Sequence, residues 1–173
     1  MILLDRVVAV LDGSGTPCAL IGAAALAAAG VARSTFDVDL LTTDPLVLRP
    51  SLWAGLRAEG VTVEIRHADR DDPLGGVVRI EAPAERPVDV IVGKHAWQDR
   101  AVRRARRPGP GPAIVLPRDL VLLKLYAGGT QDLWDVRELL QLPDGAALAA
   151  DVESDLVGLP SSMRELWARA WAR

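Results

Sequence analysis

The feature that most constrains this chain is a strand-like segment, 36–42, that carries two aspartates at alternate positions. Side chains two residues apart on a strand point to the same face, so Asp37 and Asp39 project together while Val38 and Leu40 face the other side. Two neighbouring carboxylates repel each other, and an apolar strand does not keep both ionised without a cation between them. The spacing predicts a cation site, or else two solvated acids at the end of a strand.

A third acid has the same kind of surroundings. Asp89 lies between Val88 and Val90 in a second apolar segment, 88–92, which we expect to be a strand. Three carboxylates form the hard oxygen cluster that suits Mg²⁺, with Mn²⁺ as the alternative ion. We therefore expect Asp37, Asp39 and Asp89 to be metal ligands and catalytic residues, with Asp89 as the general base.

A glycine turn precedes the acidic strand. In the segment Ile21-Gly22-Ala23 a short strand ends and a helix begins. Glycine lets the backbone approach a ligand closely, and the free amides of a helix N-terminus favour phosphate. A phosphate-binding turn followed by a metal-binding strand is what transfer from a nucleoside triphosphate requires.

The order of expected elements defines the fold class. The patterns predict an α/β (α+β) fold in which a mixed β-sheet is flanked by helices and followed by a helical C-terminal part. We expect one domain over 1–173, with an α/β core at 1–116 and the helical part at 117–173. The expected helices are 2–12, 23–29, 51–59 (capped by Ser51), 94–106, 117–127, 132–142 and 161–173, and the strands are 17–21, 36–42, 61–66, 77–82, 88–92 and 113–116.

Composition excludes some classes of protein. The net charge of -3 argues against a protein that coats nucleic acid through overall charge. A single cysteine, Cys18, excludes an internal disulfide framework and fits a cytoplasmic location. The apolar run 18–32 is about 15 residues long, is rich in alanine and contains two glycines, so we expect buried core there and no membrane span.

These motifs resemble those of the nucleotidyltransferase superfamily, which has a polymerase-beta-like fold. Gly22-Ala23, thirteen intervening residues, and then Asp37-Val38-Asp39-Leu40 are similar to the family pattern, and Asp89 suits its third acid. The segment 32–41 resembles small prokaryotic members, which include minimal nucleotidyltransferases and abortive-infection toxins. Residues 117–136, with Lys124 and Asp132, are similar to the C-terminal motif of that toxin group.

The resemblance implies a function and a set of site residues. It implies a magnesium-dependent enzyme that transfers a nucleoside monophosphate from an NTP to an RNA, tRNA, protein or small-molecule acceptor. A toxin of this kind would have a cognate antitoxin as its partner. The nucleotide-binding residues implied are Gly22, Ala23, Arg33, Ser34, Thr35 and Lys124.

Other interpretations stay open for several of these residues. Arg33, Ser34 and Thr35 have the composition of a capped, solvated loop as well as of a phosphate contact. Lys124, on an apolar helix face, needs an anionic partner, which is either a triphosphate or one of Asp132, Asp135 and Asp39. The family's second small residue is Ala23 here, and Gly129-Thr130-Gln131 lack the usual basic residue. These departures leave room for a non-catalytic module that binds nucleotide or protein.

Overall fold

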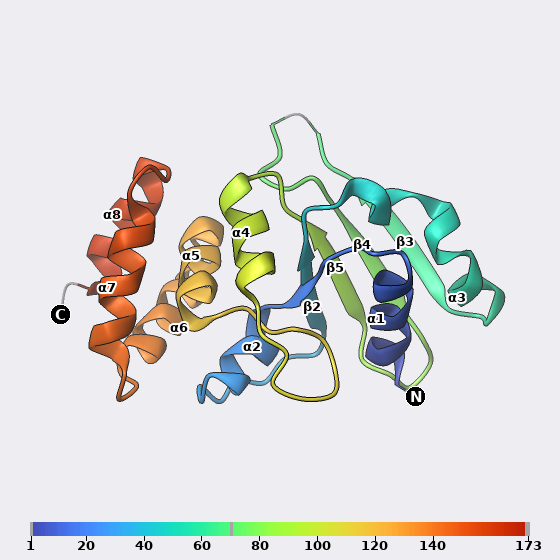
Figure 1. Cartoon of the computed structure of the whole chain (residues 1–173), viewed down its shortest axis with the longest axis horizontal. Coiled ribbons are helices and arrows are strands. Elements are labelled where there is room, and N and C mark those ends of the chain that lie inside the picture. The colour runs from blue at the N-terminus through green and yellow to red at the C-terminus, as the bar shows by residue number, and fades with distance from the viewer. Residues whose placement is uncertain (1, 70, 172–173) are drawn as a thin grey trace. The chain divides into compact units, whose positions relative to one another are not determined.

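The computed structural model describes residues 2–69 and 71–171, which form two compact units. The first unit comprises Met1–Ala24 and Ser34–Val115 and contains the whole β-sheet. The second comprises Ala25–Arg33 and Leu116–Arg173 and is helical (Figure 1). The helix α2 (Gly22–Ala28) begins in the first unit and ends in the second. None of the described helices is both long and apolar enough to cross a membrane.

The sheet of the first unit is mixed, as the sequence predicts. Its strand order is β1-β2-β5-β4-β3, and β2 and β5 are parallel while the other neighbouring pairs are antiparallel. The strands are β1 (Ala19–Leu20), β2 (Val38–Thr42), β3 (Thr62–His67), β4 (Gly76–Glu81) and β5 (Val88–Val92). The parallel pair puts segments that are some fifty residues apart in sequence side by side at the centre of the sheet.

Alternation along the strands gives the sheet one apolar face. The inward residues of β2, β4 and β5, such as Leu40, Ile80 and Val90, are fully buried. They pack against α1 (Leu3–Gly13), whose buried residues recur at helical spacing. The short helices η1 (Pro45–Leu48), η2 (Pro50–Trp53) and α3 (Ala54–Ala58) contribute Val47, Trp53 and Leu56 to the same core. The opposite face is therefore free to carry polar side chains.

Two local predictions in this unit are wrong. The helix expected at 51–59 begins as a 3-10 turn at Pro50 and becomes α-helical only at Ala54. Ser51 does not cap it, because proline is favoured at the first helical position and Ser51 therefore lies inside the turn. The expected strand at 113–116 consists only of isolated bridges, in which Ile114 pairs with Leu20 and Arg106. The helix expected at 94–106 is shorter, α4 (Ala96–Arg104).

The helical unit contains one helix that the sequence patterns missed. The helices α5 (Pro117–Ala127), α6 (Thr130–Leu140) and α8 (Ser161–Trp171) correspond to predicted ones, and α7 (Gly145–Leu156) does not. Its buried residues recur at helical spacing, but two of the four are glycine and alanine, which give little hydrophobic signal. The turn before α7 is tight, and a Cβ added to Gly145 would lie 2.0 Å from the carbonyl oxygen of Leu140.

This close approach predicts that Gly145→Ala destabilises the protein. The clash is with backbone, which must move, so we expect the free energy of unfolding in urea to fall by about 2 kcal/mol. Gly55→Ala, in α3, is the matched control because an added Cβ meets nothing within 4 Å there. That variant should be more stable than the parent by about 0.5–1 kcal/mol. Equal effects of the two substitutions would contradict the packing around Gly145.

Candidate functional site

The parallel pairing of β2 with β5 brings the three acids together. Asp39 and Asp89 are register partners, so their side chains leave the same face of the sheet next to each other. Asp37 lies just before β2, which begins at Val38 and not at Phe36 as predicted. One carboxylate oxygen from each of the three acids lies within 4.8 Å of the other two, and all three side chains are partly buried. Their role as metal ligands and catalytic residues stays a prediction.

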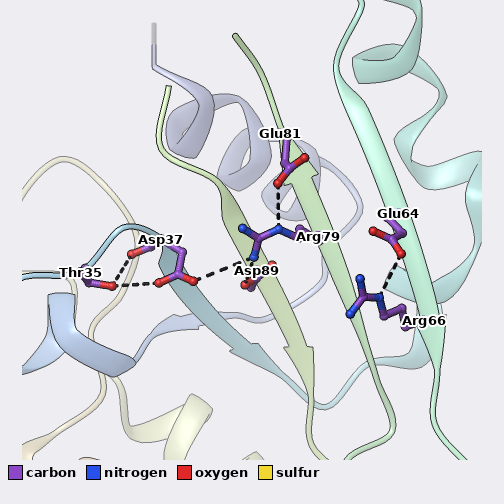
Figure 2. A network of polar contacts seen from close by, with 7 residues as sticks. All are labelled: Thr35, Asp37, Glu64, Arg66, Arg79, Glu81 and Asp89. Carbon is purple, nitrogen blue, oxygen red and sulfur yellow. Dashed lines mark hydrogen bonds and ion pairs between the residues drawn. The ribbon is translucent and has the colours of Figure 1, made fainter. Parts of the chain in front are cut away.

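Asp89 is held by an arginine that the sequence analysis did not select. Arg79 on β4 is the register partner of Asp89, and its Nη1 donates to Asp89 Oδ2 at 2.8 Å. Nη1 also lies 3.9 Å from Asp37 Oδ2, and Nε donates to Glu81 Oε1 at 2.8 Å. Figure 2 shows the Arg79 guanidinium bonded to Glu81 on one side, with Asp89 and Asp37 both in reach of its Nη1. The alternation of apolar and polar residues in 77–81 is a signal that Arg79 lies on the polar face of its strand. Only the strand order shows that it lies beside Asp89.

The environment of Asp89 disfavours its charged form. Burial raises the pKa of the Asp89 carboxyl above its ordinary value, the Arg79 guanidinium opposes this, and the Asp37 carboxylate adds to the rise. Asp89 Oδ1 is buried and accepts no hydrogen bond from any described residue. A buried oxygen that lacks a donor costs free energy. A hydrogen-bond donor or a cation from outside the chain would offset that cost.

These observations fit a divalent cation. The donor set consists of carboxylate oxygens, which are the ligands that Mg²⁺ and Mn²⁺ prefer. A bound cation would offset the mutual repulsion of the acids and would satisfy the buried Oδ1 of Asp89. Among the residues that the structure describes, this is the group of acidic, histidine or cysteine side chains that converges closely enough to hold a metal.

Gly22 lies directly against the acid cluster. Its φ is +62°, and a Cβ added there would lie 2.1 Å from Asp39 Oδ2. The amide of Ile21 donates to the Asp39 carbonyl at 2.9 Å, which fixes the turn beside β2. Glycine is therefore required here for its backbone conformation and for the space that Asp39 occupies. Gly22 and Ala23 as nucleotide-binding residues remain a prediction.

Two loop residues predicted to bind nucleotide precede Asp37. The Thr35 hydroxyl lies 2.8 Å from Asp37 Oδ1 and 3.1 Å from the Asp37 carbonyl oxygen, and Figure 2 shows the first contact on the outer side of the cluster. It orients Asp37 at the start of a strand, so in the structure the Thr35 hydroxyl serves this local contact and not a helix cap. Ser34 is exposed, and so is Phe36, whose side chain is 77% accessible. Nucleotide contacts by Ser34 and Thr35 stay predictions.

In the helical unit, Lys124 pairs with the acids that the sequence offered as alternatives to a triphosphate. Its Nζ lies 2.9 Å from Asp132 Oδ1 and 2.7 Å from Asp135 Oδ2. Asp135 is only 4% exposed and also accepts from Arg33 and, at 3.2 Å, from Gln131. Asp132 additionally accepts from the Gly129 amide at 3.1 Å and so caps α6. Asp135 and Asp132 thus together neutralise both predicted nucleotide-binding cations of this unit.

Arg33 also lines a cavity within the helical unit. The cavity has a volume of about 620 Å³ and is bounded by the segment 30–33 and by one face of α6. Trp134, an exposed aromatic side chain, lies in its wall with Gln131, Glu138 and Gln141. The lining of this cavity thus combines an indole with amide and carboxylate groups.

Comparison with known proteins shows the fold. No protein-family model matches the chain, and no curated protein matches it in sequence. Among solved structures, it is similar to an antigenic nucleotidyltransferase-like protein from Paracoccidioides brasiliensis, with 16% identity, a TM-score of 0.50, and coverage of 94% of this chain and 90% of the other. It is equally similar to ANT(2″)-Ia in complex with adenylyl-2″-tobramycin, with 16% identity, a TM-score of 0.50 and coverage of 97% and 94%. The chain therefore has the nucleotidyltransferase fold that the sequence motifs predicted.

The contact between Gly22 and Asp39 gives a test of the glycine turn. We expect Gly22→Ala to lower the free energy of unfolding by about 1–2 kcal/mol for its positive φ and by about 1–3 kcal/mol more for the clash with Asp39. Gly15→Ala is the matched control, because Gly15 has a φ of +71° and open space around it. Urea unfolding of both variants separates the two costs, and equal losses would contradict the close approach of Asp39.

The raised pKa of Asp89 predicts how its replacement depends on pH. Because the pKa of Asp89 is higher in the folded protein than in the unfolded chain, the folded protein is favoured while this carboxyl is protonated. That stabilisation is fully present below the ordinary pKa of about 3.9 and is lost as pH rises through the higher pKa of the folded protein. In EDTA at pH 7, Asp89→Asn should therefore unfold at a higher urea concentration than the parent, and the difference should shrink toward pH 4. Asp99, whose pKa is lowered by its bond to Arg103, is the control, since Asp99→Asn should have the opposite sign. A loss of stability at pH 7 in Asp89→Asn would contradict the prediction.

Proposed function

We propose that the protein is a nucleotidyltransferase that transfers a nucleoside monophosphate from an NTP to an acceptor and depends on Mg²⁺ or Mn²⁺. The observation that carries this proposal is the convergence of Asp37, Asp39 and Asp89 beside the Gly22 turn in a nucleotidyltransferase fold. In the reaction, an acceptor oxygen forms a bond to the α-phosphorus while the bond from that phosphorus to the β-phosphate oxygen breaks. Pyrophosphate leaves, and the proton of the acceptor goes to a base.

The acid cluster supplies the cation site and the base. Asp37, Asp39 and Asp89 would hold the cation, which supplies positive charge to the phosphates and lowers the barrier to attack. We propose Asp89 as the group that accepts the proton, because it lies in the cluster and Arg79 fixes the orientation of its carboxylate. Its raised pKa moves it toward the range that suits a general base.

The nucleotide contacts are proposed for each unit by itself. Gly22 and Ala23 would present backbone amides to the triphosphate, and Ser34 and Thr35 would contribute hydroxyl groups. Arg33 and Lys124 would contribute positive charge, in exchange for part of their pairing with Asp135. Lys124 is only 11% exposed and is paired with Asp132 and Asp135, so a phosphate would have to displace one of these acids to reach it.

Three kinds of acceptor follow from the sequence and the comparisons. An RNA such as tRNA, or a protein side chain, suits a toxin that acts with a cognate antitoxin in the cytoplasm of a prokaryote. A small molecule is the third, because ANT(2″)-Ia was solved in complex with adenylyl-2″-tobramycin. We infer that the acceptor presents a hydroxyl or phosphate oxygen, which is the nucleophile that a carboxylate base and a divalent cation can activate.

A second function is favoured by two departures from the family pattern. Ala23 adds a methyl group at the start of α2, where the family has a second glycine or serine, and Thr130 and Gln131 stand where a basic residue is usual. A protein that binds NTP without transferring it, or that acts as a protein-interaction module, would tolerate both changes. The three converging acids argue against this second function, because their repulsion destabilises the fold unless a cation is bound.

Nucleotide binding and turnover test these two functions together. We expect calorimetry to show NTP binding with Mg²⁺ and none in EDTA, and Asp39→Asn to weaken it at least about tenfold. With each labelled NTP and total cellular RNA, protein or aminoglycoside, the parent should release pyrophosphate, and Asp39→Asn should lose at least about 100-fold of that rate.

The control for this experiment is Asp99→Asn, which removes an acid of the same unit that is bonded to Arg103 and Thr43 and lies outside the cluster. It should bind and react like the parent. Metal-dependent binding without pyrophosphate release would favour the non-catalytic module. Binding that is unchanged in Asp39→Asn would eliminate the cation site and the metal-dependent transfer with it, and would leave only a module that does not use the acids.

A further inference from the structure

Arg79 connects the proposed cation site to an acid outside it. Its guanidinium uses Nη1 for Asp89 and Nε for Glu81, both at 2.8 Å, and Nη1 is 3.9 Å from Asp37. The β4–β5 register places the arginine beside Asp89, so its position comes from the sheet and not from a flexible loop. Glu81, two residues along the same strand, fixes the other side of the guanidinium (Figure 2).

The contact with Asp89 is directional. Arg79 occupies Asp89 Oδ2 and leaves Oδ1 buried and without a donor from the described residues. A carboxylate held through one oxygen has a fixed orientation, so its other oxygen points to a defined place. Arginine stays charged at all physiological pH values, which makes it a permanent counter-charge for Asp89 and Asp37.

We propose that Arg79 is a positioning residue that acts as the built-in counter-cation of the acid cluster. It holds Asp89 and Asp37 in place before a divalent cation arrives, and it lowers the affinity of the site for that cation. The inference rests on the cation site of the proposed function and adds a regulator of its occupancy. If Arg79 stabilises the cation-free protein more than the cation-bound protein, it must weaken cation binding by the same free energy. This follows because folding and cation binding are linked equilibria.

A neighbouring arginine provides the contrast. Arg66 on β3 donates from Nε to Glu64 at 3.0 Å, but both side chains are more than half exposed, and no described acid of the cluster is paired with Arg66. An exposed pair of this kind contributes little to stability. Arg66→Gln therefore removes the same charge and the same kind of bond as Arg79→Gln from the adjacent strand. Arg66 forms its ion pair with Glu64, and Asp89 is only the last of the contributions to its raised pKa, so the effect of this variant on the cluster should be much smaller.

The test measures stability without cation and affinity for Mn²⁺, on the full chain. In EDTA, we expect Arg79→Gln to lower the midpoint of thermal unfolding by about 5 °C and Arg66→Gln to change it by less than about 1 °C. Mn²⁺ binding, followed by the electron paramagnetic resonance of the free ion, should be on the order of tenfold tighter in Arg79→Gln and unchanged in Arg66→Gln. Saturating Mn²⁺ should restore most of the lost midpoint in Arg79→Gln.

Arg79→Lys separates charge from shape. It keeps the positive charge but shortens the donor group, so its Mn²⁺ affinity should stay within about threefold of the parent. If Arg79→Gln matches Arg66→Gln in both measurements, or if Arg79→Lys binds Mn²⁺ as tightly as Arg79→Gln, the inference is overturned. If the parent itself binds no Mn²⁺, the proposed function and the effect of Arg79 on affinity both fail. In that case the stability arm in EDTA still decides whether Arg79 holds the acids together.

Discussion

The parallel pairing of β2 with β5 is the interaction on which the candidate site depends. It places Asp39 and Asp89 side by side, with Asp37 one step beyond the strand end, on the face opposite the apolar core. Carboxylates at this distance repel each other. The aspartate charges therefore oppose the pairing of β2 with β5. The buried contacts of Leu40 and Val90 with α1 stabilise the sheet despite that repulsion.

Three residues of the first unit accommodate the repelling acids. Arg79 brings a positive charge from the next strand, Thr35 bonds to Asp37 from the preceding loop, and Gly22 leaves room for Asp39. Each of these contacts orients one acid, and together they leave the buried Oδ1 of Asp89 as the unsatisfied position. A site built in this way is preorganised, because its ligands are held before the cation binds.

Sequence patterns predicted individual strands and helices and the motif that carries the acids. They did not predict contacts that depend on strand order, or a helix with few large apolar residues. Alternation located β5 and the inward residues of β2, because side-chain period depends only on neighbours in the chain. The motif around Asp37 and Asp39 led to the correct fold. Arg79 was missed because its partner Asp89 is adjacent only across the β4–β5 register, which a sequence pattern does not contain. Helix α7 was missed because Gly145 and Ala149 bury little apolar area.

The helical unit balances its charges differently from the sheet. Asp135, whose side chain is 4% exposed, contacts both Lys124 and Arg33, and Asp132 is the second acid for Lys124. Two cations and two acids are therefore matched there, whereas in the sheet one arginine contacts two acids of the cluster. Removal of Arg79 would leave those acids facing each other without compensation. The acid cluster thus has the excess of one charge that a divalent cation would offset, and the ion-paired group of the helical unit does not.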